Sequence, residues 1–210
     1  MAKRTGEKYK AIIEAAVKVI AENGYHNSQV AKIAKEAGVA DGTIYLYFKN
    51  KEDLLISLFR VKMGEFVASA RQELRSLSNP FEQLAKLISL HFSRLQENRH
   101  LALVLQIELR QSDASIRSGI AAPLKEYFNI IDDVVNEGVR LDAFRRDVNP
   151  KLVRQMIFGT MDEVATSWVM SQRHYKLTDQ IKPVYSLLAQ ALAREGKFRP
   201  FPNHVLNNAG

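Results

Sequence analysis

Apolar residues recur at helical spacing along most of this chain, in segments that are separated by capping residues, glycines and prolines. The first such segment runs from Ile12 to Ile20 and is ended by Asn23-Gly24. Asn79-Pro80 and Asn149-Pro150 mark two further helix starts, because asparagine accepts hydrogen bonds from the first free amides of a helix and proline fits its first position. The pattern therefore predicts an all-α protein.

Residues 28–48 predict two short helices joined by a tight turn. The hydroxyl of Ser28 is expected to cap the first of them, and Gly38 is expected to end it. Asp41-Gly42 is expected to open the second, which buries Ile44. A pair of helices with this spacing is a helix-turn-helix, a motif that inserts its second helix into the major groove of DNA.

The next segments are interpreted as helices as well. Asn50 and Asp53 resemble a capping box for a helix that begins at Lys51 and runs for about 25 residues, long enough to act as a lever. Residues 101–109 alternate in hydrophobicity as a strand does, but no other segment offers a partner strand, so this one is interpreted as a buried helix. Pro123 is expected to break or kink the helix that precedes it.

The predicted helices fall into three parts. Residues 1–50 form a helix-turn-helix DNA-binding domain, residues 51–195 a larger helical domain for ligand binding and dimerisation, and residues 196–210 a tail. The last helix of the large domain is expected to begin at Thr178, whose hydroxyl would cap it. The tail has two prolines and no helical period, so it is expected to be mobile or to lie as a strap on the surface.

Positive charge is concentrated at the start of the chain. The net charge is +7, and the first 51 residues contain nine Lys and Arg against five Asp and Glu. This balance favours a polyanionic partner such as DNA. The chain contains no cysteine, which excludes disulfides, thiolate metal sites and cysteine nucleophiles. The charged start MAKRTGEKYK and the lack of a long uncharged run predict a cytoplasmic protein without a membrane segment, associated with the nucleoid when bound to DNA.

The apolar positions of the helix-turn-helix leave one face of the pair free. This face combines amide, hydroxyl, phenol and ammonium groups, which suit phosphates and base edges. It consists of Gln29, Lys32, Lys35, Thr43, Tyr45, Tyr47 and Lys49. Lys51, at a helix N-terminus, and Lys3 and Arg4 are further candidates for contacts with the DNA backbone. Each residue alone could be ordinary solvated surface, and only the combination indicates DNA binding.

Residues 19–25 (VIAENGY), 30–39 (VAKIAKEAGV) and 42–52 (GTIYLYFKNKE) resemble the DNA-binding domain of the TetR family of repressors. The resemblance implies that a set of polar residues meets DNA, mostly at phosphates, with Thr43 nearer the bases. These residues are Ser28, Gln29, Thr43, Tyr45, Tyr47 and Lys51. Ala40 stands where a serine is common, and Leu46 where a polar or basic residue is common. The base sequence of the operator therefore does not transfer from the family.

Two core segments extend the resemblance to the FadR-type fatty-acid-degradation repressors of bacilli within this family. They are residues 106–112 (QIELRQS) and 154–163 (RQMIFGTMDE), and the resemblance covers residues 7–193. It implies a repressor of fatty-acid β-oxidation genes that long-chain acyl-CoA releases from DNA. Acyl-CoA would be the effector ligand, and no further cofactor is expected.

A long acyl chain needs an apolar site, because each buried methylene contributes about 0.8 kcal/mol. The candidates on predicted inner faces, each of which could also be plain core, are Phe66, Leu87, Phe92, Leu95, Leu103, Ile107, Phe128, Ile131 and Met156. The CoA phosphates need cations, and Arg110 is the first choice because it lies in a segment that carries the resemblance. The other candidates are Arg71, Arg94, Arg99 and Arg117.

The last two helices carry apolar stripes interrupted by small residues, a pattern that favours a four-helix interface in a homodimer. The candidate interface residues, which could instead face their own core, are Gly159, Met161, Val164, Trp168, Val184, Leu188 and Ala191. A two-fold dimer predicts a near-palindromic operator whose half-sites lie roughly 34–36 Å apart. A ligand that displaces the long helix beginning at Lys51 would change this spacing and release the DNA.

Two other functions are alternatives to this one. An enzyme is disfavoured, because the five histidines share no metal-ligand spacing, the adjacent acidic pairs point to different sides of a helix, and the glycines form no phosphate loop. Within the regulators, the alternative is a TetR-type repressor that senses another lipophilic ligand, such as a drug or amphiphile, and controls efflux.

Overall fold

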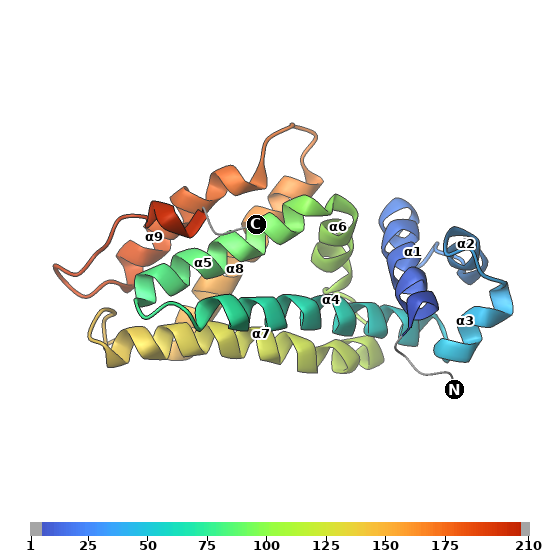
Figure 1. Cartoon of the computed structure of the whole chain (residues 1–210), viewed down its shortest axis with the longest axis horizontal. Helices are drawn as coiled ribbons and strands as arrows, with labels where there is room; N and C mark the ends of the chain where they lie inside the picture. Colours follow the sequence, from blue (N-terminus) through green and yellow to red (C-terminus); the bar gives the residue numbers. More distant parts are fainter. Residues whose placement is uncertain (1–5, 207–210) are drawn as a thin grey trace. The chain divides into compact units, whose positions relative to one another are not determined.

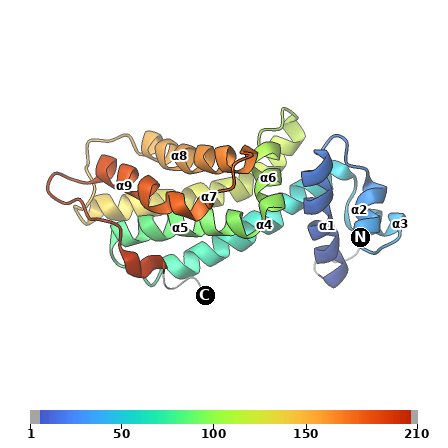
Figure 2. The ribbon, with the colours of Figure 1, turned by 90° about the horizontal axis from the view of Figure 1, so that it is seen from above.

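The computed structural model describes residues 6–206, and the regular elements in that range are all helical (Figures 1 and 2). The predicted all-α fold class is confirmed. The α-helices are α1 (Glu7–Asn23), α2 (Val30–Glu36), α3 (Asp41–Tyr47), α4 (Lys51–Leu74), α5 (Pro80–Glu97), α6 (Arg99–Glu108), α7 (Ala114–Arg140), α8 (Pro150–Met170) and α9 (Ile181–Leu192). Two short 3-10 helices, η1 (Leu177–Gln180) and η2 (Asn203–Leu206), complete the set.

These helices form two compact units. The first contains the residues up to Gly64 together with Arg99–Pro123, and the second contains Glu65–Asn98 together with the residues from Leu124 onward. Helices α4 and α7 therefore contribute residues to both units. The domain boundaries expected from the sequence, at residues 50 and 195, stay predictions.

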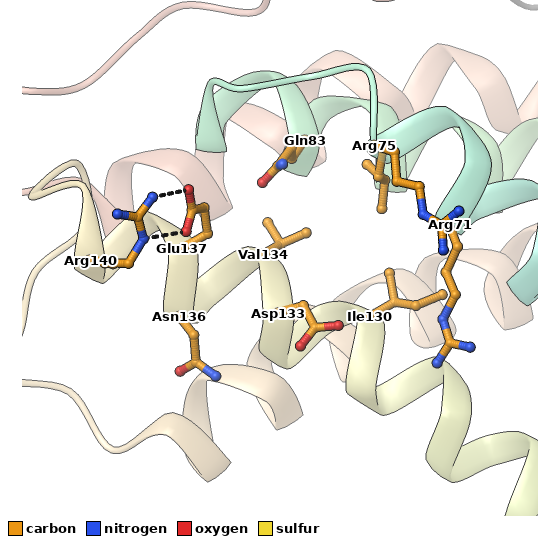
Figure 3. A pocket seen from close by; sticks show the side chains of 10 residues that line it. Arg71, Arg75, Gln83, Ile130, Asp133, Val134, Asn136, Glu137 and Arg140 are labelled. Carbon is orange, nitrogen blue, oxygen red and sulfur yellow. Dashed lines mark hydrogen bonds and ion pairs between the residues drawn. The ribbon is translucent and has the colours of Figure 1, made fainter.

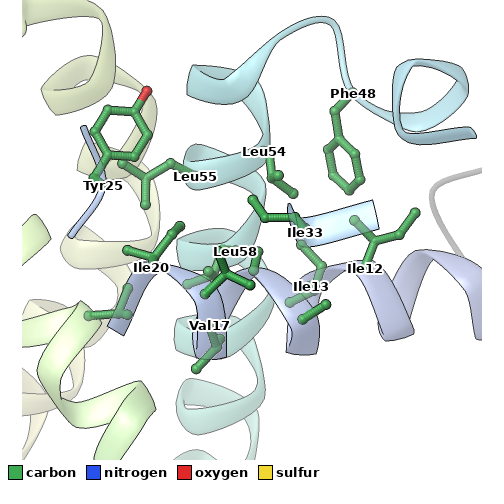
Figure 4. Close-up of a cluster of buried hydrophobic side chains, with 14 of the residues drawn as sticks. Ile12, Ile13, Val17, Ile20, Tyr25, Ile33, Phe48, Leu54, Leu55 and Leu58 are labelled. Atoms are coloured by element: carbon green, nitrogen blue, oxygen red, sulfur yellow. The ribbon is translucent and has the colours of Figure 1, made fainter. Parts of the chain in front are cut away.

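The core of the first unit joins the short helices to α1 and to the start of α4. Figure 4 shows the side chains of α1 meeting Ile33 of α2, Phe48 at the end of α3, and leucines of α4. Ile12, Ile33 and Phe48 are fully buried, and so is Leu58. Helix α6 lies against α1 and belongs to the same unit. The alternating segment is thus a helix, as predicted, except that Leu109 follows the end of α6.

Three asparagines begin helices as predicted. The side chain of Asn50 accepts a hydrogen bond from the Asp53 amide at 2.8 Å, at the start of α4. Asn79 accepts from the Phe81 amide at 2.9 Å at the start of α5, and Asn149 accepts from the amides of residues 151 and 152 at the start of α8. Each carbonyl oxygen satisfies backbone donors that have no partner within the helix.

The two hydroxyl caps differ from the prediction. Ser28 donates to the carbonyl oxygens of Val19 (3.2 Å) and Gly24 (2.7 Å), so it satisfies the end of α1 instead of the start of α2. Thr178 lies inside η1, and its amide and hydroxyl both donate to Oε1 of Gln96 on α5. Ser28 therefore bonds the turn that precedes it, only four residues back, whereas Thr178 bonds a side chain 82 residues earlier in the chain.

Pro123 does not end a helix, because α7 is continuous on both sides of it. A proline removes one amide donor from the helical ladder. The apolar residues nevertheless keep helical spacing across it, with Ile116 and Ile120 buried before it and Tyr127 and Ile131 buried after it. Burial on both sides favours an uninterrupted helix over a break.

The second unit is built on α5, which packs against both α8 and α9. Helices α8 and α9 also contact each other, as Figure 2 shows. The described part of the tail lies on this unit as a strap. Tyr185 of α9 donates a hydrogen bond to the carbonyl oxygen of Arg199 at 2.9 Å, its ring meets Phe201 at 5.2 Å between centroids, and Val205 is buried.

A close approach near the end of α7 depends on a glycine. A Cβ added at Gly138 would overlap the ring of Phe144, which is itself buried and packed edge-on against Phe81. Because that ring has no free space to retreat into, we predict that Gly138→Ala lowers the free energy of unfolding by about 1–3 kcal/mol. Urea denaturation followed by circular dichroism measures the change.

Gly64→Ala is the matched control. Gly64 is also helical, but nothing lies within 4 Å of an added Cβ, so alanine should raise the free energy of unfolding by up to about 1 kcal/mol. Equal effects of the two substitutions would contradict the close packing of Gly138.

Candidate DNA-binding and ligand-binding sites

Helix α3 presents one free face. Tyr45 and Leu46 are 56% and 58% exposed, and Gly42 and Lys49 are exposed as well. Gly42, Tyr45 and Leu46 are spaced i, i+3 and i+4, so they follow one side of α3, whereas Lys49 lies after the helix, beyond the extended Phe48. The opposite side buries Ile44 in the core of the first unit. The buried side fixes the orientation of α3 and leaves the other side available for a partner.

Aromatic contacts hold the end of α3 against α1. The ring of Tyr9 stacks on Phe48 at 5.2 Å between centroids, and Tyr47 lies 6.1 Å from Tyr9 at a tilt of 47°. Tyr47 is consequently half-buried, as is Thr43 near the start of the helix. These two side chains lie at the border of the free face.

Lys51 holds the turn between α1 and α2. Its ammonium group donates to the carbonyl oxygens of His26 (3.0 Å) and Ser28 (3.1 Å), and it lies 4.6 Å from the centre of the Tyr25 ring. The same turn is also bonded to Glu108 at the end of α6, whose Oε1 accepts from the Tyr25 amide at 3.1 Å. Side chains of α4 and α6 thus satisfy backbone groups of one turn.

The residues predicted to contact DNA differ in their exposure. Gln29, Tyr45 and Lys49 are exposed, and Thr43, Tyr47 and Lys51 are half-buried. Ser28 is buried and its hydroxyl points to α1, so its side chain is not on this surface. Lys3 and Arg4 lie outside the described residues. The contacts themselves stay predictions. Leu46 belongs to the free face but was not among them, although its i+4 spacing from Gly42 places it there.

Residues 106–112 form a polar network around Glu108. Gln106 and Glu108 are buried despite their polarity. Gln111 donates to Oε2 of Glu108, and Arg110 donates to the carbonyl oxygen of Gln106. Sequence reasoning selected Arg110 as a ligand contact and missed Glu108. The signal was present, because a carboxylate within an apolar helix needs a partner.

In the second unit, His91 and Tyr127 form a buried polar pair. Tyr127 Oη lies 2.9 Å from His91 Nδ1, and the two rings stack at 5.7 Å between centroids. Burial lowers the pKa of His91 to about 4 and raises the pKa of Tyr127, so both are neutral at neutral pH. Phe66 and Phe158 pack edge-on against Tyr127. His91 is thus a hydrogen-bonded residue of the interior of the second unit.

The predicted ligand contacts fall into both units. Those in the second unit are Phe66, Leu87, Phe92, Leu95, Phe128, Ile131 and Met156, and those in the first unit are Leu103, Ile107 and Arg110. Leu87, Phe92 and Ile131 are fully buried, whereas Ile107 is 41% exposed. The aromatic contacts of the second unit join Phe66 to Tyr127 and Phe128 to Phe158. Their roles in ligand binding stay predictions.

A polar groove of about 540 Å³ lies in the second unit, between α4, α5 and α7 (Figure 3). It contains three arginines, of which Arg140 pairs with Glu137 at 2.6 Å and Arg71 pairs with Glu126 at 2.5 Å. Asp133 lines the groove as well. Carboxylates therefore balance most of the arginine charge of the groove, and the predicted contact of Arg71 with the phosphates of CoA stays a prediction.

Four of the seven predicted interface residues are buried in the second unit itself. These are Met161, Trp168, Val184 and Leu188. Helix α5 packs against both α8 and α9, so it covers much of their apolar stripes within the chain. Gly159, Val164 and Ala191 are at least partly exposed. The outer sides of the two helices carry other apolar residues, among them Met170 and Leu187, which are 59% and 67% exposed.

Within residues 6–206, no helix is long and apolar enough to cross a membrane. The same residues contain no group of three or more His, Asp or Glu side chains that could hold a metal ion.

Comparisons with known proteins extend over both units. Residues 12–58 match the family described as bacterial regulatory proteins, tetR family, and residues 59–191 match the family described as YsiA-like protein, C-terminal region. The fatty acid metabolism regulator protein of Bacillus subtilis is 50% identical over 190 residues, which cover 90% of this chain and 98% of that protein.

Solved structures agree with this match. The transcriptional regulator FadR from Bacillus subtilis in complex with stearoyl-CoA is similar with a TM-score of 0.84 and 51% identity, over 87% of this chain and 98% of that chain. The fatty acid degradation regulator FadR from Bacillus halodurans has a TM-score of 0.83 and 52% identity, over 86% of this chain and 97% of that chain.

These relatives confirm that the chain is a regulator and not an enzyme. The helix-turn-helix in α2 and α3 and the match over nearly the full length of a fatty acid metabolism regulator lead to one conclusion. This chain belongs to the TetR family of bacterial transcriptional regulators and is a fatty acid metabolism regulator of the FadR type.

Proposed function

We propose that this protein is a homodimeric repressor of fatty-acid degradation genes, which binds a near-palindromic operator and is released by long-chain acyl-CoA. The observation that carries the proposal is the 50% identity over nearly the whole length of a fatty acid metabolism regulator. A similar solved protein is described in complex with stearoyl-CoA, a long-chain acyl-CoA. A role on bacterial DNA would place its work in the cytoplasm.

The free face of α3 supports DNA binding. It combines the phenol of Tyr45 with a glycine that allows close backbone approach, and the exposed Lys49 follows the helix. In a two-fold dimer, two copies of this face would enter successive major grooves only at a spacing of roughly 34–36 Å. A change in the spacing of the two faces would prevent them from entering both half-sites at the same time and would therefore weaken DNA binding.

The aromatic cluster of the second unit supports a lipophilic ligand. Phe66, Phe128 and Phe158 are only partly buried, although each packs against another ring. Flexible or partly packed aromatic side chains can line an apolar site for an acyl chain. Burial of each methylene of such a chain would contribute about 0.8 kcal/mol to binding.

Helix α6 supplies a route from the ligand to the DNA. Only Asn98 separates the end of α5 in the second unit from the start of α6 in the first. The other end of α6 holds the turn before α2 through the bond from the Tyr25 amide to Glu108. We propose that a ligand among the residues of α5 shifts α6 and, through Glu108, the helix-turn-helix. Displacement of the long helix α4 would act in the same way, because Lys51 of α4 is bonded to the same turn.

The acyl-CoA part of the proposal is tested by DNA release. A gel shift uses the DNA upstream of a fatty-acid-oxidation operon, with acyl-CoAs of 8 to 18 carbons. We expect the concentration needed for release to fall about fourfold for each added methylene until the chain fills the site. CoA alone should not release the DNA. Release that ignores chain length would favour a repressor of another lipophilic compound.

The coupling route is tested at Glu108. Glu108→Ala leaves the buried Tyr25 amide without its acceptor, which should lower the free energy of unfolding by about 1–3 kcal/mol. It should also raise the acyl-CoA concentration that releases DNA, while acyl-CoA binding measured by calorimetry changes little. Glu108→Gln keeps an acceptor oxygen and should behave more like the wild type. Equal release of DNA from the alanine variant and the wild type would contradict the route through α6.

The proposed dimer can be tested by a substitution on the outer side of α9. Leu187 is 67% exposed in the single chain, so a large part of its side chain is available to a second copy. Leu187→Glu should shift the molecular mass in size-exclusion chromatography with light scattering from dimer towards monomer. Leu141→Glu is the control, because Leu141 is also exposed but lies after α7. A dimer that survives Leu187→Glu would place the interface elsewhere.

A further inference from the structure

Leu46 is an apolar side chain on an otherwise polar DNA-reading face. It is 58% exposed, its neighbours along the free side of α3 are Gly42 and Tyr45, and the exposed Lys49 follows the helix. The resemblance to the family places a polar or basic residue at this position more often. An exposed leucine side chain makes no favourable interaction with water. It can contribute binding free energy on this face only when a partner covers it.

The residues around Leu46 limit the kind of partner. Lys35 and Lys49 of the helix-turn-helix are exposed, and of its acidic residues Glu36 is paired with Lys18 at 2.7 Å and Asp41 is exposed in the first turn of α3. The exposed lysines leave a net positive charge on this surface, which suits a polyanion and disfavours an apolar protein surface. Within DNA, the major groove offers one apolar group on a base edge, the C5 methyl of thymine.

Tyr45 differs from Leu46 in the chemistry it can use. Its ring ends in a hydroxyl that can donate to a phosphate oxygen, and phosphate contacts carry no sequence information. Leu46 has no donor or acceptor, so contact with a thymine methyl is the only base-specific recognition available to it.

We propose that Leu46 reads the methyl group of a thymine at one position in each operator half-site and is a specificity-determining residue. The inference rests on the proposed function, because it requires that α3 enters the major groove. It identifies a base and a chemical group, which the comparisons with relatives do not.

The experiment begins with selection of operator duplexes from a random DNA pool by the wild-type protein. Each thymine of the selected half-site is then replaced by deoxyuridine, symmetrically in both half-sites, and the Kd is measured by fluorescence anisotropy. Deoxyuridine keeps the base pair and removes only the methyl group. At one position we expect Kd to rise about fourfold for each methyl lost, or roughly 15-fold for the two half-sites together.

Variants at positions 45 and 46 show which side chain contacts the thymine methyl group. Leu46→Gln keeps a helix-forming residue without an apolar end, and the uracil penalty should disappear at that position. Leu46→Met should retain most of the uracil penalty, and Tyr45→Phe should retain all of it. Because Leu46 is exposed, circular dichroism should show the same fold for each variant, and Leu46→Ser is a second polar variant if Leu46→Gln does not fold.

The outcomes separate the inference from the proposed function. If the wild type selects no duplex, the proposed function fails. If it selects an operator but no thymine shows a uracil penalty, or if Leu46→Gln keeps the full penalty, the proposed function stands and the role of Leu46 is overturned. A penalty that persists in Leu46→Gln and disappears in Tyr45→Ala, which removes the ring that Tyr45→Phe keeps, would assign the methyl contact to Tyr45 instead.

Discussion

Helices α2 and α3 contain seven residues each, too few to be stable in water by themselves. They persist because they share an apolar core with α1 and the start of α4. Ile33, Ile44 and Phe48 supply this burial from the short helices, and Leu54 and Leu58 supply it from α4. The DNA-reading face is therefore a product of packing on the opposite side of the same helices. A substitution in this core would remove the face even though it changes no residue on it.

The turn between α1 and α2 is where polar bonds from several helices meet. Ser28 bonds the end of α1, Lys51 of α4 holds two carbonyl oxygens, and Glu108 of α6 holds an amide. Each bond satisfies a backbone group that has no partner in regular structure. Helices α4 and α6 are thereby linked to the position of α2 through direct hydrogen bonds. A small movement of either helix would be passed to the helix-turn-helix, because packed elements shift as units.

Much of this arrangement could be predicted from the sequence, since it depends on local chemistry. The asparagine caps at residues 50, 79 and 149 use the amides of their own following turn, so spacing alone identifies them. The predicted Ser28 cap was wrong because the hydroxyl bonds the preceding turn instead of the following one, and the Thr178 cap was wrong because the hydroxyl bonds Gln96, which only the fold brings near. The carboxylate of Glu108 likewise acts over 83 positions in the chain, a distance that periodicity does not address. The stripes of α8 and α9 were ambiguous, because a helix covered by its own chain and one covered by a second copy have the same pattern.

The strap over α9 has a consequence for how much change the end of this chain tolerates. Arg199, Phe201 and Val205 all pack against or bond to the second unit, with Val205 almost completely shielded from water. Ends of chains commonly accumulate insertions, early stops and proteolytic nicks without effect. Here a late nonsense mutation or a cut between residues 193 and 199 would strip cover from Tyr185 and from α5. Selection should therefore act on this segment as it does on a core helix.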